Sequence, residues 1–165
     1  MKLDSLDIEI IRKFKKNKNM KKVILTTLIF LAAKFISLAA GPDDVVGVWL
    51  VGDKDYKIEL YKTANGEIEG KVVWMKEPND KKGKPRTDVD NPDPKLQSRP
   101  VMGLKTVTGF KYDKQENEFV DGKVYKKGKT YCGKMKLNTD GTLYLRGYIC
   151  SASIFGKSDT WTRVK

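Results

Sequence analysis

The stretch KTYCGKMKLNTDGTLYLRGYIC, residues 129–150, decides the fold of this chain. Apolar and polar residues alternate on both sides of Thr139-Asp140-Gly141, a composition typical of a tight turn. Successive strand residues face opposite sides, so a three-residue loop pairs Leu137 with Leu143, and the next apolar pair with them, on one face. A two-residue loop would separate those side chains. We therefore predict an antiparallel hairpin with Gly141 in the left-handed conformation.

The same register brings the two cysteines of the chain together. Cys132 and Cys150 fall on the other face of the hairpin, on adjacent strands and diagonal to each other. A disulfide is geometrically possible there, and a pair of buried free thiols is the alternative. Two lone cysteines do not make a closed zinc site, so we expect no metal to be bound by them.

Short runs of the same kind continue outward from this hairpin to both ends of residues 45–164. Apolar residues recur there with a period near two, separated by Gly, Asn, Asp and Lys. Eight strands joined mostly by short turns would leave exposed edges unless the sheet closed, so we predict an all-β fold, a single antiparallel up-and-down β-barrel. Such a barrel encloses either packed side chains or one small ligand. The strands are expected at about 45–51, 56–62, 67–76, 104–111, 118–126, 129–138, 142–150 and 157–164.

Aromatic residues at the two ends of this region predict how the barrel closes. Trp49 lies in the first strand, and Trp161 and Arg163 lie in the last. First and last strands are neighbours in a closed barrel, so Arg163 is expected to stack on Trp49 as a cation on an aromatic face. We assign these three residues a structural role in closure, because buried Trp side chains mostly pack.

Residues 1–40 read as an N-terminal extension and a signal peptide. Met20-Lys21-Lys22 precedes the apolar run 23–33, and small residues at 37–41 form a cleavage site. An uncleaved anchor needs about 20 apolar residues, and Lys34 interrupts the run too early. We take Met20 as the true start, 41–165 as the barrel domain, and the protein as exported, periplasmic or secreted, without a stable membrane span after cleavage.

Composition narrows the classes of function. Residues 1–40 carry 9 of the 33 Lys and Arg residues but only 3 of the 21 Asp and Glu residues. The remaining, exported part therefore has a net charge of +6, which is weak evidence for nucleic-acid binding. The chain has no His, which removes the usual nucleophile pairs and the commonest metal ligand. We expect that the protein is not an enzyme and has neither a cofactor nor a nucleic-acid partner. The residues do not exclude hydrolysis catalysed by a pair of carboxylates.

One stretch, residues 77–103, breaks the strand pattern. It holds five of the six prolines, and connections beyond about 15 residues are usually functional or disordered, so we expect an ordered flap. Trp74 precedes the flap and Arg99 lies near its end. They either hold an apolar ligand with an anionic head at one mouth of the barrel, or serve structure, Trp74 in the core and Arg99 bonded to carbonyls or to Asp88.

Three stretches together resemble the bacterial exported family known as domain of unknown function 2147. They are GVWLV at 47–51, residues 70–112 and residues 128–164. The resemblance implies a small exported β-barrel of no established function, and its shared positions add Lys84 and Asn91 to the candidate ligand-binding residues Trp74, Asp88 and Arg99. The Gly-x-Trp start and Trp-Thr-Arg end are also similar to the calycins, the lipocalin-like barrels.

The sequence leads to two hypotheses of function. The first is a barrel that binds a small, mostly apolar or amphiphilic ligand under the flap. The alternative is an envelope structural or interaction module with a solid barrel and no ligand, which predicts an exposed apolar patch. Neither the ligand nor the oligomeric state follows from the residues.

Overall fold

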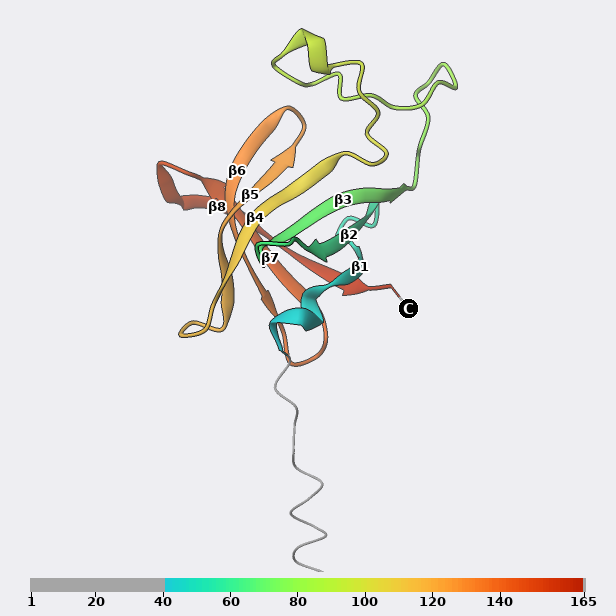
Figure 1. Ribbon diagram of the computed structural model, residues 1–165. Helices are drawn as coiled ribbons and strands as arrows, with labels where there is room; N and C mark the ends of the chain where they lie inside the picture. Colours follow the sequence, from blue (N-terminus) through green and yellow to red (C-terminus); the bar gives the residue numbers. More distant parts are fainter. Residues whose placement is uncertain (1–40, 165) are drawn as a thin grey trace, which may run out of the picture. The chain divides into compact units, whose positions relative to one another are not determined.

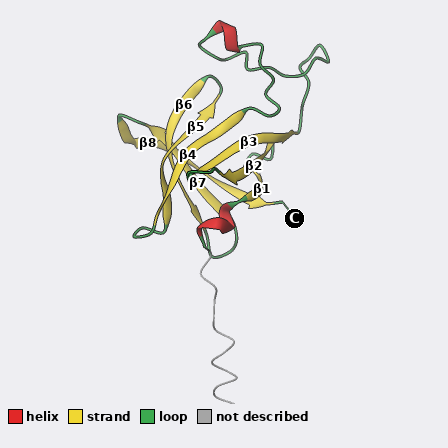
Figure 2. Ribbon diagram, in the orientation of Figure 1, coloured by secondary structure: helices red, strands yellow, loops and turns green. Residues whose placement is uncertain are grey.

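The computed structural model describes residues 41–164, which form a closed barrel of eight antiparallel strands in sequence order (Figures 1 and 2). Two short 3₁₀-helices, η2 and η3, accompany the strands. The predicted fold class is therefore confirmed. The elements are η2 (Pro42–Val45), β1 (Gly47–Leu50), β2 (Tyr56–Lys62), β3 (Ile68–Met75), η3 (Pro94–Leu96), β4 (Lys105–Asp113), β5 (Glu118–Lys126), β6 (Lys129–Leu137), β7 (Leu143–Ile149) and β8 (Ala152–Arg163).

The first and last strands close the barrel. Trp49 of β1 pairs with Arg163 of β8, whose guanidinium carbon lies 4.3 Å from the centroid of the Trp49 ring. Arg163 also donates hydrogen bonds to the carbonyls of Val46, at 2.9 Å, and Asp44. The Trp49 indole is fully buried and donates to the Val45 carbonyl at 2.8 Å. The residues before β1 are thus tied to the end of β8.

The β6–β7 hairpin has the register that the alternation of residues predicts. Leu137 pairs with Leu143, and Gly141 adopts a φ of 81° in the connecting turn. A disulfide joins Cys132 to Cys150 on the outer face of this hairpin, with Cα atoms 5.0 Å apart. It ties the turn between β7 and β8 to β6.

Large side chains fill the barrel around Phe110. This residue is fully buried, and its ring lies over Gly122 of β5, where a Cβ atom would overlap the ring. A Cβ atom on Gly133 of β6 would lie 2.9 Å from the Cζ atom of Phe110. The glycines therefore provide the room that the ring occupies. The rest of the buried core consists of Val45, Trp49, Val51, Ile58, Leu60, Ile68, Val72, Met75, Val107, Phe119, Met135, Leu143, Leu145 and Trp161.

Two strands begin at least two residues from the predicted position. Strand β8 begins at Ala152 and not near 157, because residues 147–149 of β7 extend the pairing back as far as Ala152. Strand β1 begins later than expected, because residues 42–45 form η2, where Pro42 has the φ that a helix start needs.

The order of the strands defines two ends of the barrel. The connections β1–β2, β3–β4, β5–β6 and β7–β8 leave from one end, which we call the mouth end, and residues 77–103 belong to it. The other three connections and η2 lie at the opposite end. Residues 41–164 lie in one compact unit. The predicted signal peptide lies outside the described residues, among which no helix is long and apolar enough to cross a membrane.

Candidate functional site

The flap, residues 77–103, is held by a buried carboxylate. The Asp88 side chain is 6% exposed, and its Oδ2 atom accepts hydrogen bonds from Asn91 at 2.8 Å and from Tyr125 of β5 at 2.6 Å. Arg99 donates two more, from Nε at 3.0 Å and from a terminal nitrogen at 2.8 Å. The Arg99 guanidinium also lies over the Tyr125 ring, 5.3 Å from its centroid. Both halves of the flap are thus fastened to one strand.

The pKa of Asp88 reflects this environment. Burial by itself would raise it, but the hydrogen bonds from Tyr125, Asn91 and Arg99 and the positive charge of Arg99 outweigh burial and lower the pKa below its usual value. Burial and the nearby carboxylate raise the pKa of Tyr125. Asp88 is therefore ionised at neutral pH, and its hydrogen bonds to charged and polar groups hold the flap on β5. We call the cluster of Asp88, Asn91, Arg99 and Tyr125 the lock.

We expect Asp88→Asn to lower the free energy of unfolding by about 2 kcal/mol at pH 7, because Arg99 would lose its charged partner. A lowered pKa in the folded state means that Asp88 stabilises the fold above its unfolded pKa of about 3.9, and that this contribution fades as the pH falls through the folded value. The difference between the two proteins in urea unfolding should therefore shrink as the pH falls below about 3.9. The exposed neighbour Asp90 gives the control Asp90→Asn; equal losses for the two variants at pH 7 would contradict the lock.

The structure brings together three of the five residues that the sequence nominated for ligand binding: Asp88, Asn91 and Arg99. Tyr125 completes their cluster, and the sequence gives no signal for it, because a tyrosine in a strand is common and the contact spans 37 residues. The segment also contains two Asx turns, since Asn91 accepts a hydrogen bond from the amide of Asp93 and Asp93 accepts one from that of Lys95.

The other two nominated residues lie apart from this cluster. Lys84 is exposed in a turn, where its amide bonds to Asp80. Trp74 is 38% exposed, with the Lys57 ammonium 4.9 Å from its ring centroid, so it is not a core residue. Strict alternation from Val72 would have turned Trp74 inward, but a register shift in the β2–β3 pairing puts Met75 inside instead.

Inward-facing residues near the mouth end are less buried than those around Phe110. Val124 pairs with Tyr131 on the inner face of β5 and β6, and both are half-buried. Gly147 follows on β7, and a Cβ atom there would meet only the Cβ atom of Tyr131, at 3.8 Å. A side chain would therefore fit at Gly147 but not at Gly133, its partner in the β6–β7 pairing, and we call the inner face of β5–β7 formed by Val124, Tyr131 and Gly147 the open half.

An ion pair links opposite sides of the mouth. Lys126, at the end of β5, lies 3.7 Å from a carboxylate oxygen of Asp53 in the β1–β2 connection. Strands β1 and β5 are four places apart in a ring of eight, so the pair spans the opening. Lys126 thus offers a cation at the rim of the open half.

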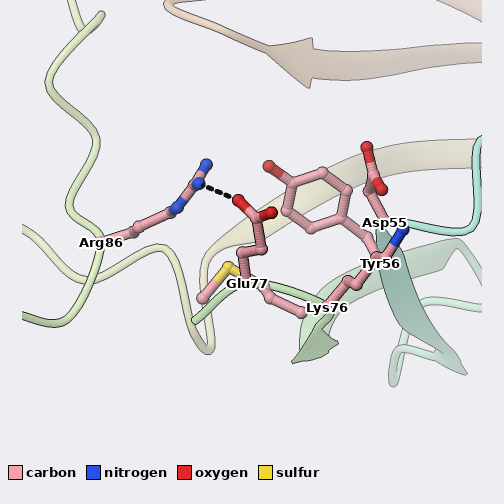
Figure 3. Close-up of a pocket in the computed structure, with 6 residues that line it drawn as sticks. Asp55, Tyr56, Lys76, Glu77 and Arg86 are labelled. Carbon is pink, nitrogen blue, oxygen red and sulfur yellow. Dashed lines mark hydrogen bonds and ion pairs between the residues drawn. The ribbon is translucent and has the colours of Figure 1, made fainter. Parts of the chain in front are cut away.

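A small cleft lies where the flap leaves β3. Its volume is about 100 Å³, and Arg86 and Glu77 bridge one side at 2.7 Å (Figure 3). Asp55 and Tyr56 of the β1–β2 side and Lys76 of the flap side make it mostly polar. It is too small for a ligand of drug size, which needs roughly 300 Å³ or more. Among residues 41–164, no three His, Cys, Asp or Glu side chains gather as a metal site would require.

Comparison with known proteins identifies the family. The family model described as "Uncharacterized protein conserved in bacteria (DUF2147)" matches residues 47–163, nearly the whole barrel. The chain belongs to this family. A search of curated proteins finds no match to this DUF2147 protein.

A solved structure supports the fold of the DUF2147 domain. It is described as "Protein HP1028 from the human pathogen Helicobacter pylori belongs to the lipocalin family", and it is 24% identical with a TM-score of 0.62. The alignment covers 73% of this chain and 82% of that one. The DUF2147 barrel is accordingly lipocalin-like in fold.

Proposed function

We propose that this is an exported protein that binds a small, mostly apolar ligand with an anionic head in the open half of its barrel, beside the flap. The observation that carries the proposal is the contrast between two parts of the interior. Side chains around Phe110 leave no room at Gly133, whereas Val124, Tyr131 and Gly147 present a half-buried, largely apolar inner face where a further side chain would fit. Apolar concave surfaces with few polar groups are the usual ligand sites of such folds.

Charge at the rim favours an anionic head group. Lys126 stands at the end of β5, and Lys157 of β8 pairs with Gly147 of the open half. Both lysines are exposed. The flap packs against the β5–β6 turn, where the backbone of Asp90 touches Gly128 so closely that no side chain fits. The flap therefore lies beside the open half and is held there by its contact with the β5–β6 turn.

The Cys132–Cys150 disulfide supports export, because structural disulfides persist in oxidising compartments and are rare in the cytosol. The basic and apolar pattern of residues 20–41 supports a cleaved signal peptide. Mass spectrometry of the secreted or periplasmic protein should find a chain that begins near Gly41; a chain that retains residues 23–33 would contradict cleavage.

Filling the open half should weaken ligand binding without harming the fold. We expect Gly147→Leu to weaken binding of 1-anilinonaphthalene-8-sulfonate at least roughly tenfold, or about 1.4 kcal/mol. Fluorescence titration measures the affinity for the dye. Displacement of the dye by dodecanoate tests whether the site also binds a carboxylate head group. Thr130→Leu places the same side chain on the exposed outer face of β6 and should bind as the parent does.

Two outcomes would overturn this proposal. Equal affinities for Gly147→Leu and the parent would place the probe elsewhere on the barrel. A parent that binds neither probe, and that shows a clean mass in native mass spectrometry after purification from its own compartment, would favour the alternative of a solid interaction module. The exposed side chains of Ile154 and Phe155 are the observation that supports that alternative.

A further inference from the structure

The two ends of the barrel carry opposite charge. The mouth-end connections and their flanking residues, 49–57, 74–106, 125–130 and 148–153, hold 13 basic and 7 acidic residues. The described residues at the opposite end, 41–48, 61–69, 112–119, 136–144 and 162–164, hold 4 basic and 8 acidic ones. The net charge of the domain is thus concentrated on one end, where an anionic surface would be attracted.

Exposed apolar side chains gather at the same end. Among the described residues, every exposed large apolar side chain except Val46 lies in or beside a mouth-end connection. Ile154 is 80% exposed and Phe155 63% exposed in the β7–β8 hairpin, which projects from the barrel in Figure 1. The others are Trp74, Val89, Leu96, Met102 and Ile149. Soluble domains rarely leave such groups clustered without a use.

We propose that the mouth end docks on the surface of an anionic phospholipid bilayer. Each Lys or Arg near such a surface contributes about 1 kcal/mol of attraction, and apolar side chains gain by entering the headgroup region. The apolar residues stand on two separate connections, β3–β4 and β7–β8, and not on one flat face, an arrangement that suits a fluid partner better than a folded protein. This inference goes beyond ligand binding and does not require it.

The β7–β8 hairpin is built to enter the headgroup region. Ile154 and Phe155 lie near the start of β8, and residues 147–156 contain no charged residue. The Cys132–Cys150 disulfide ties the turn of this hairpin to β6, so the turn is held in place before it meets the bilayer. Lys129, which begins β6, is exposed and supplies charge on the neighbouring hairpin.

Sedimentation with vesicles tests the proposal on residues 41–165, which contain the whole compact unit and omit the apolar N-terminal run. No ligand is added, so the result is independent of the ligand assay, which contains no vesicles. We expect binding to vesicles of equal parts phosphatidylcholine and phosphatidylglycerol to exceed binding to phosphatidylcholine alone by roughly tenfold or more. Salt at about 0.5 M should remove most of it.

Matched variants locate the surface. Lys82→Glu/Lys129→Glu at the mouth end should lower the affinity for anionic vesicles at least roughly tenfold. Lys62→Glu/Lys114→Glu makes the same charge change at the opposite end and should leave binding nearly intact. Phe155→Ser should remove the part of the binding that persists in high salt, with an unchanged circular dichroism spectrum. Binding by neither vesicle type, or equal losses for the two double variants, would overturn the proposal.

Discussion

Replacing Phe110 by Ala is expected to lower the free energy of unfolding by about 3–5 kcal/mol, the range for removal of a fully buried aromatic ring. The ring fills the barrel between Gly122 and Gly133, and backbone closed into a barrel cannot collapse around the cavity. Urea unfolding followed by tryptophan fluorescence measures the loss. Phe110→Leu, which keeps part of the volume, should lose less and remains informative if the alanine variant fails to fold.

The same contact predicts a coupling that separates steric fit from other effects. Gly122→Ala should destabilise the parent by about 1–3 kcal/mol, because the new Cβ atom overlaps the Phe110 ring. In the Phe110→Ala background the extra methyl group meets a cavity, so its cost should nearly vanish. Additive losses in the double variant would show that the ring does not lie over Gly122.

Removal of the disulfide is the second large effect that we expect. Cys132→Ser/Cys150→Ser should lower the free energy of unfolding by about 3 kcal/mol, since the bond closes a loop of 18 residues in the unfolded chain. Thermal unfolding by circular dichroism, with and without dithiothreitol, measures it.

The serine double variant provides its own control for this experiment. Reductant should lower the melting temperature of the parent and leave that of the variant unchanged. If reduction does not alter the parent, the thiols are not joined in the purified protein, and the support that the disulfide lends to export is lost as well.

Much of the fold could be predicted from local sequence patterns, because barrel topology follows from the alternation of apolar and polar residues and from the residues in the turns. The register of Leu137 with Leu143 follows from loop length alone, and the diagonal placement of Cys132 and Cys150 follows from that register. The same reasoning failed at Trp74, because one register shift in β2–β3 exchanges the two faces of a strand and no local residue pattern announces it.

The candidate site was only partly predictable from the sequence. The flap was recognisable by its prolines and missing alternation, and Asp88 and Arg99 within it form the pair that one of the sequence interpretations anticipated. Tyr125 and the open half beside Gly147 could not be predicted from the sequence, because their roles depend on contacts between segments distant in the chain.

The amino-acid sequence by itself determined an eight-stranded antiparallel barrel, the position of its long flap and the proximity of its cysteines, because these follow from period-two alternation, turn residues and strand count. Only the tertiary structure decided which part of the interior is filled, that Trp74 faces outward, and that basic and exposed apolar residues share one end. Those properties arise when side chains far apart in the chain compete for the same volume or project from the same rim, and local patterns do not encode such competition.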